Sequence, residues 1–274
     1  MTDEPNPEPA DKIRYDKPNS ARVWNYWLGG KDNYHVDRLA GDAVIAINPD
    51  IRLFARQWRQ FLIRAVRYLA GEAGIRQFLD IGTGLPNEQN THEVAQAVAP
   101  DSKIVYVDND ALVLAHARAL LTNTTPEGVT HYIHADVRDP EAIISDAHNT
   151  LNFHQPIAVM MLGILGHAAP AYDQARSIID RLMAAVPSGS YLVWADGAIT
   201  DDEVFLAGVR AQTEAGHPYH PFALDEFAEA VAGLELVDPG LVPVPEWRPD
   251  PIQVGAATRR SSLYCVVARK PADR

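Results

Sequence analysis

The chain has 274 residues, of which 47% are hydrophobic and 22% are charged. This composition is typical of globular proteins, and a chain of this length hides about three-quarters of its surface on folding, which excludes disorder as its main state. Asp and Glu number 36 against 24 Lys and Arg, giving a formal charge of −12. That balance argues against a nucleic-acid partner, because phosphate binding needs clustered positive charge.

The sequence also carries indications of location. The longest apolar stretch, residues 157–165, has about half the length that a membrane-spanning helix needs, so we expect a buried strand there and no membrane association. The N-terminus lacks a basic start followed by an apolar stretch, and we expect no secretory signal. Cys265 is the single cysteine, so no internal disulfide is possible and a cytoplasmic protein is expected.

The first part of the chain divides into a tail and a helical region. Residues 1–18 carry four prolines among charged residues and predict a disordered tail. Residues 19–73 have a helical pattern and are expected to form a cover or lid. Its first helix is predicted over 21–28, with Ser20 as the N-cap and Gly29-Gly30 as the stop.

A second helix is predicted from Pro49 or Asp50 to Ala70. Its large apolar residues and its arginines fall on opposite sides of a helix. The apolar side is expected to pack in the core and consists of Phe54, Trp58, Phe61, Leu62, Ala65, Val66 and Leu69. The opposite, cationic side consists of Arg52, Arg56, Arg59 and Arg67.

Residues 74–274 are predicted to form an α/β domain, because short apolar runs alternate with helical stretches. Strands are expected near 77–81, 103–107, 130–135, 156–162, 190–195, 235–242 and 262–268. Helices are expected over 89–98, 110–121, 140–147, 172–185, 201–214 and 223–232. A proline-rich stretch joins the last two strands and does not suit a crossover helix, so these strands are expected to pair antiparallel at the edge.

The first predicted strand ends in two glycines, Gly82 and Gly84. Glycines at this place let backbone N–H groups approach a ligand closely. Asp80 lies just before them, and Asp108 and Asp136 follow the next two predicted strands. Since parallel strands end at one edge of their sheet, the three carboxylates are expected to form one rim, with Asp108 placed to accept hydrogen bonds from a ribose.

The spacing of this loop distinguishes two kinds of nucleotide site. A dinucleotide-binding fold has a third glycine, which lets the pyrophosphate sit on the helix N-terminus. Asn87 occupies that position here. Asp80 would also repel a pyrophosphate, whereas it suits the ammonium of an amino acid or a sulfonium.

Asp80, Gly82, Gly84, Asp108 and Asp136 together are similar to the pattern of class I S-adenosylmethionine-dependent methyltransferases. The wider sequence resembles the actinobacterial S-adenosyl methyltransferase family, whose substrate is unassigned. The resemblance covers the chain from residue 20 to residue 270 approximately. The matching segments are ARVWNYWLGGKDNY at 21–34, QFLDIGTGLP at 77–86, HEVAQ at 92–96, YVDND at 106–110, GLELV at 233–237 and WRP at 247–249.

The resemblance implies a Rossmann-like α/β fold with a seven-stranded, mostly parallel sheet whose last strand is antiparallel. It also implies the cofactor S-adenosyl-L-methionine. Asp80 and the backbone of Gly82-Thr83-Gly84 would hold the methionine part, and Asp108 would hold the ribose. The other implied contacts are Asn109 at the adenine face, Asp136 and Val137 at the adenine edge, and Leu162 and Gly163 beside the sulfonium.

Further cofactor contacts are expected from the helical cover. The Gly29-Gly30-Lys31 turn, with Tyr26 and Tyr34, is expected to fold over the cofactor. Arg56 is the arginine expected to hold a carboxylate of the cofactor or of an acidic substrate.

His167 and Asp196 are the candidates for a catalytic base. Relatives carry Leu-His after the fourth strand, where this chain has Leu165-Gly166-His167. Relatives often carry Ser-His after the fifth strand, where this chain has Ala195-Asp196. The ten histidines are not accompanied by an HExxH or paired-cysteine motif, so no metal site is expected.

These residues predict methyl transfer from S-adenosyl-L-methionine to a small molecule by in-line displacement, with positioning as the main source of catalysis. Two alternatives stay open. The departures at the candidate bases favour a non-catalytic S-adenosylmethionine-binding regulator, and the general fold class also suits an NAD(P)-dependent reductase.

Overall fold

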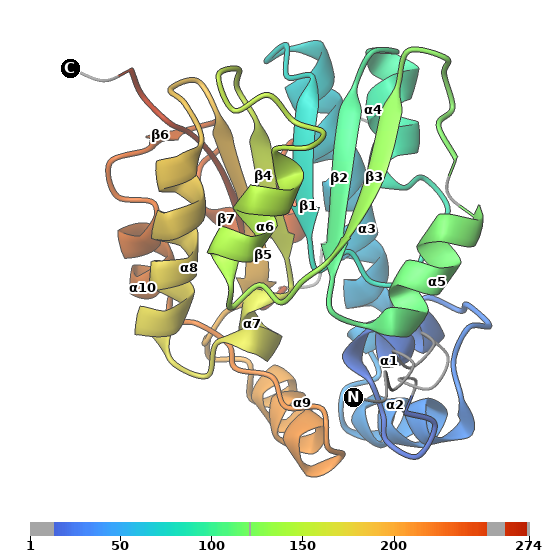
Figure 1. Ribbon diagram of the computed structural model, residues 1–274. Helices are drawn as coiled ribbons and strands as arrows, with labels where there is room; N and C mark the ends of the chain where they lie inside the picture. Colours follow the sequence, from blue (N-terminus) through green and yellow to red (C-terminus); the bar gives the residue numbers. More distant parts are fainter. Residues whose placement is uncertain (1–13, 121, 251–260, 273–274) are drawn as a thin grey trace, which may run out of the picture.

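A mostly parallel β-sheet forms the middle layer of the protein, and helices cover both of its faces (Figure 1). The structure is a computed structural model that describes residues 14–120, 122–250 and 261–272, so most of the predicted tail lies outside the described residues. The strands are β1 (Gln77–Ile81), β2 (Lys103–Asp108), β3 (Val129–His134), β4 (Ala158–Leu162), β5 (Tyr191–Gly197), β6 (Glu235–Leu236), β7 (Val242–Pro243) and β8 (Leu263–Arg269).

The helices fall into a group before the sheet and a group between its strands. The first group is α1 (Ser20–Trp27), α2 (His35–Ile47) and α3 (Ile51–Gly71). The second group is α4 (Thr91–Val98), α5 (Ala111–Leu120), α6 (Pro140–Ala147), α7 (Leu165–Ala168), α8 (Tyr172–Ala185), α9 (Glu203–Glu214), α10 (Leu224–Ala230) and the short 3-10 helix η2 (Val244–Glu246).

The strand order is β3-β2-β1-β4-β5-β8-β6, and β7 also pairs with β8. Strands β1 to β5 are parallel, whereas β8 is antiparallel to β5. The chain enters at β1, moves outward to β3 and then returns to β4 beside β1. This reversal between β1 and β4 opens a crevice at the carboxyl ends of the strands, where open α/β sheets bind ligands. The predicted Rossmann-like α/β class with an antiparallel last strand is confirmed.

The sheet has eight strands in the described residues rather than the predicted seven. The prediction of one strand over 235–242 is wrong, because this stretch forms β6 and β7, each of two residues. Between them Pro239 has no N–H to give to a ladder, and Gly240 adopts φ 87°, so the chain turns. Both short strands pair antiparallel with β8, as expected for this edge.

Two predictions for the N-terminal helices need correction. The N-cap of α1 is Asn19 and not Ser20, since the Asn19 side chain accepts a hydrogen bond from the N–H of Arg22. Helix α2 was not predicted. It packs closely on α1 through Gly41, where a Cβ would come within 2.7 Å of the Tyr26 ring. A glycine in a helix lowers the local helix propensity, so the sequence signal for α2 is weak.

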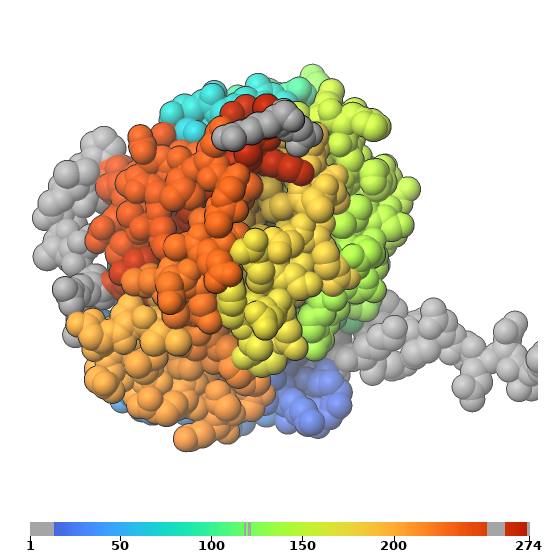
Figure 2. Space-filling view, turned by 90° about the vertical axis from the view of Figure 1, so that its left-hand side faces the viewer, coloured from blue at the N-terminus to red at the C-terminus, as the bar shows by residue number. Residues whose placement is uncertain are grey.

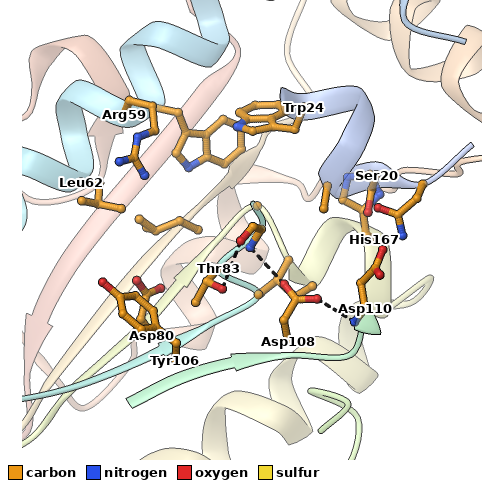
Figure 3. A pocket seen from close by; sticks show the side chains of 18 of the residues that line it. Ser20, Trp24, Arg59, Leu62, Asp80, Thr83, Tyr106, Asp108, Asp110 and His167 are labelled. Carbon is orange, nitrogen blue, oxygen red and sulfur yellow. Dashed lines mark hydrogen bonds between the residues drawn. The ribbon is translucent and has the colours of Figure 1, made fainter. Parts of the chain in front are cut away.

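Helix α3 is confirmed, and its predicted apolar side is buried. On the opposite side Arg52, Arg56 and Arg67 are exposed. Arg59 differs, because its side chain is half-buried and points into the interior at the carboxyl edge of the sheet (Figure 3).

Helices α1, α2 and α9 lie beyond the carboxyl edge of the strands, at the lower end of the molecule in Figure 1. Helix α9 packs against α2, and Figure 2 shows the light-orange surface of α9 next to the blue N-terminal region. The crevice is therefore covered from two sides, by the N-terminal helices and by α9. Among the described helices, none is long and apolar enough to cross a membrane.

A buried ion pair fixes the N-terminal helices to one another. The Arg22 Nε of α1 lies 2.8 Å from Asp37 Oδ2 of α2, and both side chains are almost completely buried. The same carboxylate accepts hydrogen bonds from the backbone N–H groups of Asn19 and Tyr34. Asp37 therefore joins the start of α1, the start of α2 and an arginine, which gives the cover a defined geometry.

Candidate functional site

A cavity lies at the carboxyl edge of the strands, between the sheet and the helical cover (Figure 3). The end of β1, the end of β2 and the end of β4 form its base. Side chains of α1, α3 and α9 form its other walls. Of the predicted site residues, the structure brings together Asp80, Gly82, Thr83, Gly84, Asp108, Asn109, Leu162, Gly163 and His167 in this lining.

The loop after β1 has the shape of a ligand cradle. Gly82 and Gly84 have φ values of 74° and 65°, in the region that favours glycine. A Cβ on Gly82 would lie 2.5 Å from the Cβ of Ile164, so no side chain fits there. The N–H of Gly82 donates to the carbonyl oxygen of Val107, which ties the loop to β2. Because Gly82 and Gly84 have no side chains, the backbone of this loop is accessible from the cavity.

Asp80 lies at one end of the cavity and is only 5% exposed. Its Oδ2 accepts a 2.6 Å hydrogen bond from the Thr91 hydroxyl at the start of α4. Burial raises the pKa of Asp80 to about 6, against the lowering effects of Thr91 and of the nearby Arg59. A buried carboxylate of this kind is stabilised by a bound cation.

Arg59 provides the cation of the cavity wall nearest to Asp80. Its Nη2 donates to the carbonyl oxygens of Glu88 and Gln89, each at 2.9 Å, so the guanidinium is held over the loop between β1 and α4. Burial lowers the pKa of Arg59, and the charge of Asp80 counteracts that effect. The predicted carboxylate-binding residue, Arg56, is exposed and does not line the cavity.

Asp108 ends β2 and is held by backbone groups. Its Oδ2 accepts a 3.0 Å hydrogen bond from the N–H of Gly84, and its Oδ1 accepts one of 2.9 Å from the N–H of Asp110. Burial raises the pKa of Asp108 to about 6, and these backbone hydrogen bonds oppose the rise. Two backbone N–H groups therefore orient the carboxylate toward the cavity (Figure 3).

Asp136 and Val137 lie in a second hollow beside the main cavity. Asn109, Asp108 and His167 line both spaces. Arg138 forms an ion pair with Asp136, and this pairing lowers the pKa of Asp136 to about 2. Asn109 Nδ2 donates to Asp136 Oδ2 at 3.1 Å, so the rims of β2 and β3 are linked.

His167 lies in α7, at the boundary between the two spaces. Its Nδ1 is 2.9 Å from the carbonyl oxygen of Pro218. Because a carbonyl oxygen only accepts, Nδ1 carries the proton and Nε2 has the lone pair. Burial lowers the pKa of His167 to about 4, so the ring is neutral at neutral pH. The side chain is thus suited to accept a hydrogen bond rather than to hold a positive charge.

Asp196, the other predicted base, does not line the cavity and is fully buried. It accepts hydrogen bonds from the hydroxyl of Tyr219 at 2.6 Å and from the indole N–H of Trp194 at 3.1 Å. Burial raises the pKa of Asp196 to about 7. Tyr219 does line the cavity, so Asp196 contacts this wall from behind.

The predicted cofactor contacts in the cover have other positions. The Tyr26 hydroxyl donates to Asp42 at 2.6 Å, away from the cavity. Gly30 belongs to the turn after α1, where a Cβ would lie 2.3 Å from Asn25 Nδ2, and Lys31 is exposed beside it. Tyr34 packs beside Leu85, Leu112 and Val113, next to the loops that carry the acidic rim. The geometry of this turn therefore arises from packing within the cover.

Several cavity residues were not predicted as site residues. They are Ser20 and Trp24 of α1, Phe54, Trp58 and Arg59 of α3, Thr91 of α4, Phe205 of α9, and Tyr219. Arg59 had a signal, because it belongs to the predicted cationic side of α3. The aromatic residues had none, since a helix that covers a cavity and a helix that covers a core show the same apolar periodicity.

Groups of three or more His, Cys, Asp or Glu side chains that could hold a metal ion are not found among the described residues. The chemistry of the lining is instead that of an amino acid and nucleoside site. One end has a carboxylate and an arginine, the middle has the glycine backbone of the loop after β1, and the other end has a second carboxylate beside a hollow with polar and apolar walls.

Comparison with known proteins agrees with this geometry. The model of the S-adenosyl methyltransferase family matches residues 6–271. A DUF574 family protein from Streptomyces avermitilis is 41% identical, with a TM-score of 0.88, covering 94% of this chain and 100% of that one. A candidate methyltransferase from Thermobifida fusca is 38% identical, with a TM-score of 0.84, covering 94% and 97%.

More distant structures share the fold. Human N-acetylserotonin methyltransferase, solved with S-adenosylmethionine, is 11% identical with a TM-score of 0.51, covering 96% of this chain and 66% of that one. A comparison with curated proteins gave no match. The family match favours the predicted methyltransferase over the regulator and the reductase that the sequence left open. The chain belongs to the S-adenosyl methyltransferase family and is an S-adenosylmethionine-dependent methyltransferase.

Proposed function

We propose that the cavity binds S-adenosyl-L-methionine across β1, β2 and β3 and that the enzyme methylates a small molecule held beyond it. The observation that carries this proposal is that two carboxylates at strand ends and the glycine loop between them line the same cavity. Asp80, the Gly82–Gly84 backbone and Asp108 line one cavity in this order across adjacent strands. An ammonium, a flexible chain and a ribose follow one another in the same order in the cofactor.

The methionine end of the cofactor would lie between Asp80 and Arg59. Asp80 suits the ammonium, because a cation offsets the cost of its buried charge. Arg59 suits the carboxylate, since a guanidinium binds a carboxylate through charge-assisted hydrogen bonds. Arg59 takes the role that was expected of Arg56, one helical turn away and on the inner side of α3.

The nucleoside end of the cofactor would lie at Asp108 and the neighbouring hollow. The Asp108 carboxylate, already oriented by two backbone N–H groups, has further lone pairs for ribose hydroxyls. Val137 and Ile164 supply apolar walls for the adenine, and Asp136 lies at its edge. The neutral His167 at the boundary of both spaces would accept a hydrogen bond at this end of the site rather than act as a strong base.

When bound, the cofactor would supply a methyl group that is already activated, because the sulfonium sulfur can leave as a neutral thioether. The protein then has to orient the acceptor and exclude water. Both accelerate the reaction strongly when the acceptor atom is held in line with the methyl group and the sulfur. Gly163 provides a close approach at the end of β4, where a Cβ would lie 3.1 Å from the Trp58 ring. The acidic chain makes a small molecule a better acceptor than a nucleic acid.

Calorimetric titration with S-adenosylhomocysteine tests the proposed cofactor site. Asp108→Ala removes the ribose acceptor and should weaken binding about tenfold or more. Asp173→Ala changes an exposed carboxylate of α8 away from the cavity and should bind like the wild type. Equal affinity of the Asp108→Ala and wild-type proteins would contradict the proposed ribose site.

A further inference from the structure

The cavity extends beyond the proposed cofactor site, over the other half of the sheet edge. Strands β4, β5 and β8 end or begin at this edge, because β8 is antiparallel and starts at Leu263 beside Gly197. Leu162 and Leu263 contribute to the lining from these strands, and Phe205 and Tyr219 contribute from the segments that follow β5. Phe54 faces them from α3. This acceptor half is defined by these five residues together with Trp58.

The charged residues of the lining all belong to the cofactor half. Among the described residues they are Arg59, Asp80, Asp108 and Asp110. Arg59 is held by the loop after β1, and Asp110 donates its N–H to Asp108. The acceptor half has Gln212 as a polar side chain, and the Tyr219 hydroxyl is already bonded to Asp196 and Gly197.

Aromatic rings supply much of the remaining surface. Trp58 lies against Gly163 and forms an edge contact with Trp24, with ring centroids 5.2 Å apart. Phe205 and Tyr219 both approach Gly197, where a Cβ would come within 2.7 Å of Phe205 and 2.9 Å of Tyr219. Rings held in this way favour stacked or edge-on contacts with a flat apolar ligand.

We infer that the methyl acceptor is an uncharged small molecule with an aromatic face. The inference rests on the proposed function, because it takes the acidic half of the cavity to be filled by the cofactor. A charged acceptor would lose its hydration in the other half without gaining a partner of opposite charge, which is costly. An uncharged aromatic molecule gains from apolar burial and ring contacts, and the Gln212 amide is present for one polar group.

Three naphthalene derivatives test this inference on the full-length protein saturated with S-adenosylhomocysteine. They are 2-naphthol, which is neutral, 2-naphthoate, which is an anion, and 2-naphthylmethylammonium, which is a cation. Calorimetry should give 2-naphthol a dissociation constant about tenfold or more below that of either ion. Binding of either ion as tightly as 2-naphthol, or no binding of 2-naphthol, would overturn the inference.

The order of the titrations separates the two proposals. Failure of S-adenosylhomocysteine to bind contradicts the proposed cofactor site. Binding of S-adenosylhomocysteine without binding of 2-naphthol leaves that site intact and overturns the acceptor class alone.

Two matched variants locate the aromatic site. Phe205→Leu keeps an apolar side chain in the acceptor half and should weaken 2-naphthol binding about threefold to tenfold, with S-adenosylhomocysteine affinity unchanged. Phe227→Leu makes the same change at a buried position on the other face of the sheet, outside the cavity. It should change neither affinity. Unaltered 2-naphthol binding in a folded Phe205→Leu protein would contradict the assigned position.

Discussion

The carboxylate of Asp108, at the end of β2, accepts a 3.0 Å hydrogen bond from the backbone N–H of Gly84, in the loop after β1. This bond joins the glycine cradle to the acidic rim across two adjacent strands. Gly84 adopts a φ of 65°, in the region that favours glycine. The two features that identify the family in the sequence are therefore parts of one structural unit, and the cavity opens above it.

The position of Arg59 leads to a prediction that separates it from its neighbour Arg56. Arg59→Gln should weaken S-adenosylhomocysteine binding about tenfold or more, because a charge-assisted hydrogen bond to the carboxylate is lost. Arg56→Gln should have no effect, since that side chain is exposed. Calorimetry with methylthioadenosine, which lacks the amino acid part, should show equal affinity for all three proteins. A similar loss with methylthioadenosine would place Arg59 elsewhere.

Cofactor affinity should depend on pH through Asp80. Burial raises the pKa of Asp80 to about 6, so the carboxylate takes up a proton as the pH falls through that value. The protonated acid no longer attracts an ammonium, and S-adenosylhomocysteine affinity should fall by up to about tenfold per pH unit below this point. Asp108, whose pKa is also about 6, adds to the decrease. In Asp80→Asn the affinity should be low throughout, with a shallower pH profile; a profile as steep as that of the wild type would contradict the role of Asp80.

The same buried carboxylate should reduce the stability of the ligand-free protein. The pKa of Asp80 is higher in the folded chain than its ordinary value of 3.8, so protonation favours the folded state and this contribution is lost as the pH rises through about 6. Asp80→Asn should therefore raise the free energy of unfolding by about 1–2 kcal/mol near neutral pH. Below pH 3.8 the two proteins should be equally stable. Denaturant titrations at both pH values measure the difference, and a loss of stability in the variant near neutral pH would refute the argument.

The ion pair between Arg22 and Asp37 should be important for the cover. Asp37→Ala leaves a buried guanidinium unpaired and removes the acceptor of two backbone N–H groups, so it should cost about 3–5 kcal/mol of unfolding free energy. Asp180→Ala, which breaks the exposed pair with Arg176 on α8, should cost less than about 1 kcal/mol. Chemical denaturation compares the two variants. Equal losses of unfolding free energy in the two variants would contradict the role of the Arg22–Asp37 pair in holding α1 against α2.

The parallel core could be predicted because its signals are local. Each of the strands β1, β2 and β4 is a short apolar run, and Gly82, Gly84 and Asp108 mark where two of them end. The confirmed fold class and family follow from these segments. The cofactor contacts assigned to Asp80, Asp108 and Asp136 stay predictions, although the structure places all three at the expected edge.

The features that the sequence did not reveal depend on contacts between distant segments. Helix α2 contains Gly41, which lets this helix pack closely against the aromatic rings of α1, a contact that the local sequence does not reveal. Arg59 and Arg56 share one cationic side in the helical pattern, but only the packing of α3 on the sheet shows that Arg59 lines the cavity near Asp80 while Arg56 is exposed. Tyr26 is predicted to contact the cofactor together with the turn after α1, but its hydroxyl binds Asp42, and the turn packs against Asn25.

A crystal structure of the protein with S-adenosylhomocysteine tests the central claim most directly. The account predicts the ribose hydroxyls within about 3 Å of the Asp108 carboxylate, the carboxylate of the ligand at Arg59 and the adenine beside Val137. A ligand bound outside the β1–β3 edge, or with its ribose away from Asp108, would contradict it.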